Sequence, residues 1–180
     1  MIDFSPIAGE HVPDELLESS NRSQLFVCDN AEKGYSCFIT DTKGFGSDKT
    51  FIIQNPNHKD VVLVRIDGVL FERMSRCDCA VMFEDEFDFV ELKTNAANRT
   101  EESMKSQYDK SVEQLKITIR EFDSRYKDAN ITFKDLFEIV RAYSVFNPSV
   151  PSNNATQKKY SSQFAKELKI KLQFTNRIKI

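Results

Sequence analysis

The sequence predicts a mixed α/β protein (α+β), in which one long helix packs across a mixed central sheet and a β-rich segment precedes both. Apolar residues recur at steps of three and four between about Thr100 and Tyr126, which is the spacing of one helical face. Short runs rich in β-branched and aromatic residues precede this segment, and alternating residues follow it. A helix between strands buries its apolar stripe against their sheet, which defines a layered fold.

The chain length and composition favour one domain over residues 1–180. A chain of 180 residues of which 40% are hydrophobic can bury one core. No apolar run approaches the roughly 18 to 20 residues that cross a bilayer. The first ten residues lack the basic and apolar regions of a secretory signal. The sequence therefore predicts a cytoplasmic protein that makes no membrane contact.

The N-terminal part is expected to contain a short helix and then several strands. Residues 13–18 predict the helix, with Pro13 in its first turn. Residues 24–29 and 35–40 flank a turn that contains Gly, which is typical of a hairpin. Residues 50–54 and the apolar run 61–66 predict two further strands, the second one buried.

The central part is expected to form a second hairpin that leads into the long helix. Residues 76–82 and 87–93 predict its strands, and the acidic residues 84–86 its turn. Thr100 is suited to cap the helix, with acidic residues in the first turn. Seven residues form its apolar stripe: Met104, Tyr108, Val112, Leu115, Ile119, Phe122 and Tyr126.

The C-terminal part is expected to continue the sheet. Thr132 and Asp135 have the spacing of a capping box, so a short helical turn should precede a strand that ends at Phe146. Residues 147–155 predict a polar loop. Residues 169–180 alternate between apolar and polar, which is typical of one half-buried strand.

Charge is unevenly distributed along a chain whose net charge is only −3. Such a balance argues against a protein that coats nucleic acid electrostatically. The C-terminal thirty residues nevertheless carry a single acid, Glu167, and seven bases. This basic end would suit a phosphate backbone, or equally a strand edge that lysines keep in solvent. The bases are Lys158, Lys159, Lys166, Lys169, Lys171, Arg177 and Lys179.

The four cysteines lie in strand-like segments, where such residues usually serve as small buried hydrophobes. They are Cys28, Cys37, Cys77 and Cys79. Zinc binding is the alternative, but the Cys-x-Cys spacing differs from the Cys-x₂-Cys of common zinc knuckles. The sequence therefore favours a structural role.

Three charged residues of the second hairpin form the candidate site. Glu91 and Lys93 point to one side of their strand, because side chains alternate in a strand. Pairing of the two strands can bring Asp78 close to Glu91. Neighbouring apolar residues make this strand look buried, where charges are rare unless they are paired or bound to metal. The charges themselves are expected to line a cleft that faces the surface.

This set of side chains suits metal-assisted chemistry on phosphate. Two nearby carboxylates repel each other, and Mg²⁺ or Mn²⁺ would remove that repulsion by taking their oxygens as ligands. A neighbouring lysine adds positive charge where the transition state of a phosphodiester accumulates negative charge. Asp78 and Glu91 are thus the expected metal ligands, and Lys93 the charge-stabilising residue.

The order of Asp78, a turn, Glu91-x-Lys93 and a long helix resembles the PD-(D/E)xK nuclease superfamily. The resemblance covers about residues 61–146 and implies a restriction-endonuclease-like αβββαβ core. It implies metal ligation by Asp78 and Glu91, and orientation of water or charge stabilisation by Lys93. One departure is Cys77, which stands where the motif has proline.

The resemblance also implies accessory residues, which the sequence locates less sharply. Many members carry an acid on a helix before the first core strand, and Glu18 is one candidate here. Asp67, at the end of the preceding strand, is another. Gln107 and Gln114 flank the apolar stripe of the long helix; they either touch metal-bound water or phosphate, or form a polar helix edge.

The function predicted from these features is a metal-dependent nuclease acting on DNA, in repair, restriction or defence. No DNA-reading module is recognisable, so specificity would come from loops, a homodimer or a partner protein. The alternative is a catalytically inactive protein of the same fold that serves as a binding or assembly subunit.

Overall fold

The computed structural model describes residues 3–9, 11–40, 42, 49–71, 75–94, 100–150 and 154–180. Its central element is a six-stranded mixed sheet in the order β1-β5-β6-β7-β8-β9. The strands are β1 (Leu17–Ser20), β5 (Val61–Arg65), β6 (Cys79–Phe83), β7 (Glu86–Lys93), β8 (Ile139–Phe146) and β9 (Lys171–Gln173). Pairing is antiparallel from β1 to β7 and parallel from β7 to β9. A parallel neighbour requires a crossover, which a helix provides between β7 and β8.

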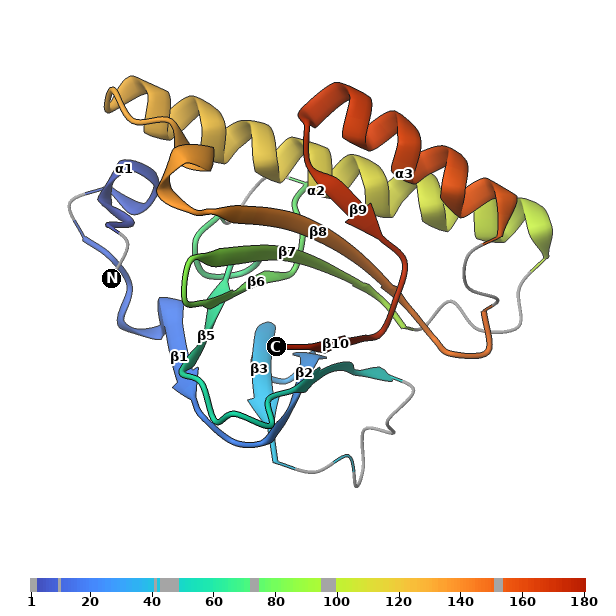
Figure 1. Cartoon of the computed structure of the whole chain (residues 1–180), viewed down its shortest axis with the longest axis horizontal. Coiled ribbons are helices and arrows are strands. Elements are labelled where there is room, and N and C mark those ends of the chain that lie inside the picture. Colours follow the sequence, from blue (N-terminus) through green and yellow to red (C-terminus); the bar gives the residue numbers. More distant parts are fainter. Residues whose placement is uncertain are drawn as a thin grey trace.

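Two helices, α2 (Glu101–Asp128) and α3 (Ala155–Leu168), cover one face of this sheet (Figure 1). The Thr100 side chain caps α2 by accepting a hydrogen bond from the Ser103 amide at 3.3 Å, as expected. The predicted stripe is buried from Tyr108 to Tyr126, whereas Met104 is partly buried. The long helix and its sheet-facing side are therefore confirmed.

A second sheet packs against the other face, in the order β10-β4-β2-β3 (Figure 1). Its strands are β2 (Gln24–Asn30), β3 (Tyr35–Ile39), β4 (Phe51–Gln54) and β10 (Arg177–Lys179). The expected N-terminal hairpin is confirmed as β2 and β3. Apolar residues of β2 and β4 form one cluster with residues of β5 to β8, so the two sheets share a core.

A close backbone approach fixes the β2–β3 turn against the end of β5. Gly68, just beyond β5, has φ of +77°, a conformation that favours glycine. A Cβ atom at this position would lie 2.3 Å from the carbonyl oxygen of Gly34 in the β2–β3 turn. Glycine at residue 68 therefore lets the small sheet reach the end of the large one, where the candidate site lies.

The N-terminal helix expected over residues 13–18 is wrong. A 3₁₀ turn, η1, covers only Asp14–Leu16, and β1 follows at once. Leu17 pairs with Val64 in an antiparallel ladder, so hydrogen bonds to β5 outweigh local helix preference. The N-terminal helix that does form, α1 (Ser5–Ala8), contains no acidic residue.

The strand expected over residues 76–82 begins three residues later, at Cys79. The preceding backbone is held by other partners. The amide of Cys77 donates to Thr118 Oγ1 at 2.8 Å, and the Asp78 carbonyl accepts from the amides of Ile66 and Asp67. Arg76 to Asp78 therefore leave the ladder and pass between α2 and the end of β5.

The C-terminal strand expected over residues 169–180 is two strands in different sheets. β9 pairs with β8, whereas β10 pairs with β4 in the second sheet. A turn separates them, in which Thr175 Oγ1 accepts from the Arg177 amide at 3.2 Å. Alternation of apolar residues cannot reveal this change, because both strands are half-buried.

Two further expectations around the C-terminal region are corrected. The loop predicted over 147–155 ends at Asn154, which caps α3 through a capping box with Gln157, so the sequence prediction missed this helix. The short helical turn after Thr132 and the strand that ends at Phe146 are confirmed as η3 (Phe133–Leu136) and β8, but the Thr132 side chain makes no capping hydrogen bond. Residues 151–153 of the predicted loop lie outside the described residues.

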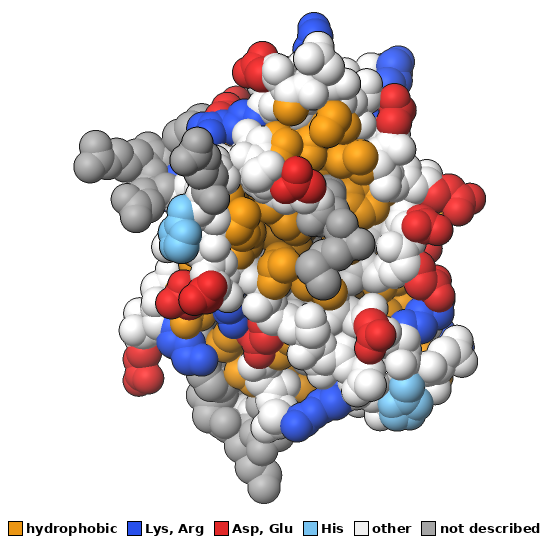
Figure 2. Space-filling model, turned by 90° about the vertical axis from the view of Figure 1, so that its left-hand side faces the viewer, with side chains coloured by type: hydrophobic (Ala, Val, Ile, Leu, Met, Phe, Trp, Pro, Cys, Tyr) orange, Lys and Arg blue, Asp and Glu red, His pale blue; other side chains and the backbone are white. Residues whose placement is uncertain are grey.

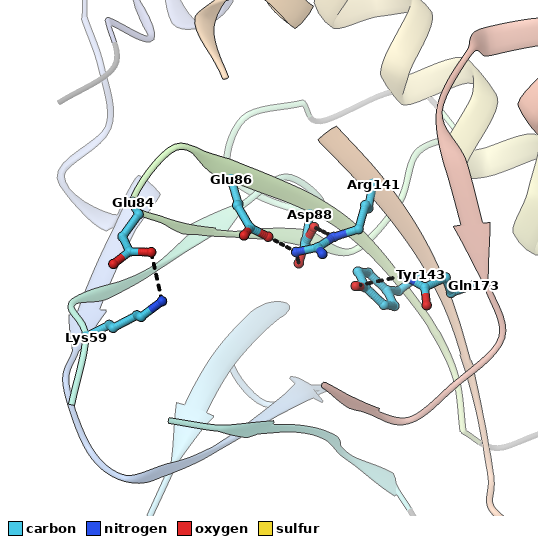
Figure 3. Close-up of polar contacts among 7 residues, drawn as sticks. All are labelled: Lys59, Glu84, Glu86, Asp88, Arg141, Tyr143 and Gln173. Carbon is cyan, nitrogen blue, oxygen red and sulfur yellow. Dashed lines mark hydrogen bonds and ion pairs between the residues drawn. The ribbon is translucent and has the colours of Figure 1, made fainter. Parts of the chain in front are cut away.

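A buried ion pair joins β7 to β8 on the side that faces the second sheet (Figure 3). Asp88 is fully buried, and its Oδ1 lies 2.8 Å from Arg141 Nε. Arg141 also pairs with Glu86. Burial raises the pKa of Asp88 to about 6, although Arg141 acts in the opposite direction. The sequence analysis did not anticipate this pair.

The surface face in Figure 2 shows acidic and basic side chains scattered around exposed apolar areas. Leu136 and Ile139 are the large apolar residues of the described chain with the greatest exposure, at 39% and 37%. Among the described helices, none combines the length and apolar character needed to span a bilayer.

The central residue of the α2 stripe offers a test of this packing. Leu115 is fully buried between helix and sheet. Leu115→Ala should lower the free energy of unfolding by about 2 to 5 kcal/mol, because it removes buried methyl groups and leaves a cavity. Chemical denaturation would measure the loss, with the exposed Glu113→Ala as control, expected within about 0.5 kcal/mol. A loss below about 0.5 kcal/mol for Leu115→Ala would contradict the packing.

Candidate active site

The β6–β7 ladder ends one residue short of Asp78 and Glu91. Its last pair is Cys79, the first residue of β6, with Val90 of β7. Asp78 lies just before β6, and its Oδ2 accepts a hydrogen bond from the Leu92 amide at 2.5 Å. The two carboxylates thus come from neighbouring backbones, and the charge of Asp78 raises the pKa of Glu91.

Burial dominates the electrostatics of both acids. Glu91 is fully buried, and burial, followed by the charge of Asp78, raises its pKa well above the usual range. Asp78 is partly buried, and burial raises its pKa to about 7, while the hydrogen bond from Leu92 acts in the opposite direction. The expectation of a cleft that exposes these charges is therefore wrong for Glu91.

Lys93 stands beside Glu91 and is held from α2. Its Nζ forms an ion pair with Glu91 Oε1. The same Nζ donates to Gln114 Oε1 at 2.8 Å, and Gln114 Nε2 donates to the Arg76 carbonyl at 2.8 Å. Gln114 thus orients the lysine and ties it to the segment that carries Asp78.

The other helix glutamine does not share this role. Gln107, about two turns before Gln114, is partly buried and makes no hydrogen bond or ion pair within the described chain. The alternative of a polar helix edge therefore describes Gln107, whereas Gln114 belongs to the cluster.

Asp67 lies next to the cluster and is partly exposed. Its Oδ1 accepts from Arg76 Nε at 2.8 Å, and its amide donates to the Asp78 carbonyl at 3.1 Å. Its negative charge contributes to the raised pKa values of Asp78 and Glu91. Asp67 is thus placed to shape the local charge, with its own carboxylate already bound to an arginine.

Glu18 lies away from the cluster. It belongs to β1 rather than to a helix, and its carboxylate pairs with Arg65 and accepts from the Phe38 amide at 3.3 Å. These contacts join β1, β5 and β3. Glu18 therefore links the two sheets. The expectation that it is an acid on a helix before the core strands is wrong, because it lies in β1.

Asp29 of β2 is a site neighbour that the sequence analysis missed. Alternation puts Asp29 on the same side as Leu25 and Val27, which pack against the large sheet. Its pKa is raised by burial and by Asp67 and lowered by Lys93, and its charge raises the pKa of Asp78. The hairpin signal predicted β2, but only the packing of the two sheets shows what Asp29 faces.

Asp78 and Glu91 are the acids that could hold a divalent cation here. Among the described residues, no three His, Cys, Asp or Glu side chains gather as a metal-binding group. Within that part of the chain, the ammonium of Lys93 is the one polar partner of the buried Glu91 carboxylate. Two desolvated carboxylates with raised pKa values gain from a shared cation. Asp78 and Glu91 are the residues that would hold it.

The cysteines remain structural in this arrangement. All four are buried and free of disulfides. Burial raises the pKa values of Cys77 and Cys79 well above the usual range, and that of Cys28 to about 12. The described cysteines also belong to no group of three or more side chains that could hold a metal ion.

The raised pKa of Asp78 predicts how pH acts on the metal-free protein. The folded state binds this proton more tightly than the unfolded chain, whose pKa is near 3.8. The free energy of unfolding should therefore increase as pH falls through about 7 toward 4, and it should be lowest above pH 7. Glu91→Gln should raise the melting temperature at pH 8, because it removes a buried charge beside Asp78. Thermal melts in EDTA at several pH values would measure both effects. A lower melting temperature for Glu91→Gln than for the wild type at pH 8 would contradict the second prediction.

Comparisons with protein-family models, curated proteins and solved structures return no match for this chain. Its function is therefore argued from the geometry described above.

Proposed function

We propose that this protein is a metal-dependent nuclease that hydrolyses phosphodiester bonds, with DNA as its substrate. The observation that carries the proposal is the buried Asp78–Glu91 pair beside a lysine that α2 orients through Gln114. Buried charged groups normally have several polar partners, whereas the Glu91 carboxylate has only Lys93 within the described chain. A site that receives a cation accounts for this arrangement.

The topology around the pair supports the same proposal. Strands β5, β6 and β7 form an antiparallel meander, α2 crosses the sheet, and β8 returns parallel to β7. This βββαβ order agrees with the last five elements of the αβββαβ core that the resemblance implies. The pair lies where β6 begins and β7 nears its end, and in this proposal the second sheet is a β-rich elaboration on the core.

In this proposal Asp78 and Glu91 bind the cation, Mg²⁺ or Mn²⁺. When bound, the cation supplies Lewis-acid activation of water and of the attacked phosphate. Lys93 places positive charge beside Glu91, where negative charge accumulates on the phosphate oxygens in the transition state. Gln114 fixes the direction of the ammonium. Asp67 and Asp29 add negative charge that favours cation binding.

The substrate and setting belong to the same proposal. The protein acts on DNA in the cytoplasm, in repair, restriction or defence, and a homodimer or a partner protein supplies sequence choice. These statements follow from the motif's resemblance.

A second candidate function is an inactive binding or assembly subunit of the same fold. One observation favours it: Glu91 is fully buried and paired with Lys93, so its carboxylate is closed to solvent. A retained ion pair would then stabilise the fold without binding metal.

One experiment separates the two candidates. Purified protein is incubated with single- and double-stranded DNA and with RNA, in Mg²⁺, Mn²⁺ or EDTA. A nuclease cleaves with metal and not with EDTA, and the metal also raises its melting temperature. A protein that shows neither cleavage of any substrate nor a metal-dependent melting shift is the inactive subunit.

A further inference from the structure

A polar groove of about 590 Å³ lies between α3 and the segment that joins β9 to β10. Three cations line it, Lys158 from α3, Lys171 from β9 and Arg177 from β10. No acidic residue is among the described residues that line the groove. Gln157, Ser161, Gln173 and Thr175 add hydrogen-bonding groups, and Ala165, Leu172 and Phe174 add apolar surface.

The cations of the groove are unpaired. Lys158, Lys171 and Arg177 are exposed, and none forms an ion pair with an acid in the described part of the chain. The single acid of residues 154–180, Glu167, is taken by Lys116 and Arg120 of α2. The positive charge of the groove is therefore free for a ligand.

The positive charge of the C-terminal segment is gathered in one place more closely than a soluble strand edge would need. Residues 154–180 carry seven bases and one acid, or +6, so the rest of a chain of net charge −3 carries −9. A strand edge kept in solvent by lysines has its charges along one strand. Here three elements, two of them in different sheets, direct cations into one concave surface.

The groove lies at the same level of the sheet as the candidate active site. Gln173 of β9 pairs with Tyr143 of β8, and the next β8 residue, Ser144, pairs with Glu91 of β7. Two strand spacings separate β9 from β7, or about 10 Å. The groove and Glu91 thus lie at the same level of the sheet, two strands apart.

We propose that this groove binds the phosphodiester backbone of a nucleic acid strand and so positions it toward Asp78 and Glu91; the positioning rests on the proposed nuclease function. Lysine and arginine side chains bind phosphates without reading sequence. The groove thus contributes affinity, and it accounts for nucleic acid binding by a chain whose overall charge is negative.

The test is a binding measurement in EDTA, where cleavage does not occur. Fluorescence anisotropy follows labelled single-stranded and duplex DNA at several salt concentrations. The groove variant replaces Lys158, Lys171 and Arg177 by glutamine. The matched control makes the same change of charge at Lys159, Lys166 and Lys179, which lie on α3 and β10 but outside the groove.

The groove variant should lose at least about tenfold in affinity near 100 mM salt. It should also reduce the slope of log affinity against log salt by about 2 to 3, because each phosphate contact contributes about 0.7 to 0.9. The control should lose less than about threefold. Equal losses in both variants, or equal binding of polyglutamate by the wild type, would overturn the inference, and so would a wild type that fails to bind DNA at low salt.

Failure of the nuclease proposal would look different. A protein that binds DNA through the groove but never cleaves it in Mg²⁺ or Mn²⁺ supports the groove and removes the proposed activity. A protein that cleaves, and whose groove variant binds and cleaves as the wild type does, retains the activity and removes the groove.

Discussion

Lys93→Ala should reduce metal-dependent cleavage by about 10² to 10³-fold, the cost of one preorganised charge-stabilising group. Glu91→Gln should abolish cleavage, because it removes one of the two carboxylates that hold the cation. The exposed Glu84→Gln, in the turn of the same hairpin, should leave the rate unchanged. The measurement is the initial rate of DNA cleavage in Mg²⁺ or Mn²⁺.

Thermal melts with and without metal separate the two roles. Lys93→Ala should keep the metal-dependent rise in melting temperature, because Asp78 and Glu91 remain. Glu91→Gln should lose most of it. Since Lys93 pairs with a buried carboxylate, Lys93→Ala should also melt lower than the wild type in EDTA at pH 8. Full cleavage by either variant would remove these residues from the active site.

Arg141→Ala should lower the free energy of unfolding by about 3 to 5 kcal/mol, because it leaves Asp88 buried without its partner. Part of that loss should appear as a rise in the pKa of Asp88 above about 6, so the variant should recover stability relative to the wild type as pH falls from 8 toward 6. Chemical denaturation at pH 8 and pH 5 would measure both effects.

Figure 3 contains the matched control for this prediction. Lys59 and Glu84 form an ion pair of 2.8 Å in which the glutamate side chain is 58% exposed. Lys59→Ala should cost no more than about 1 kcal/mol, since an exposed pair gains little over its hydration. Similar losses for Arg141→Ala and Lys59→Ala would contradict the role assigned to burial.

The pattern of residues within a short stretch of chain predicted some helices, caps and hairpins without knowledge of the rest of the fold. The α2 stripe, the cap at Thr100 and the β2–β3 hairpin are of this kind, and all are confirmed. The β6–β7 hairpin followed in the same way, although its first strand starts later than expected. Alternation and a turn thus predicted this hairpin, whereas contacts with the end of β5 and with Leu92 fix the position of Asp78.

Other features depend on partners distant in sequence. β1 exists because β5 offers it a ladder, and β9 and β10 part because two sheets compete for the C-terminal residues. Asp29, Gln114 and Arg141 acquire their roles from residues at least 21 positions away in the sequence. Each of these residues and its partner are too far apart in the sequence for a local pattern to contain both.

The sequence by itself determined the mixed fold class, the long helix and the Asp78, Glu91 and Lys93 set, because periodicity and strand alternation are local properties of the backbone. Only the tertiary structure decided that Glu91 is buried, that Gln114 holds Lys93, and that cations from α3, β9 and β10 share one groove. Burial and long-range contacts arise when sheets and helices pack, and their effects on charge follow from that packing.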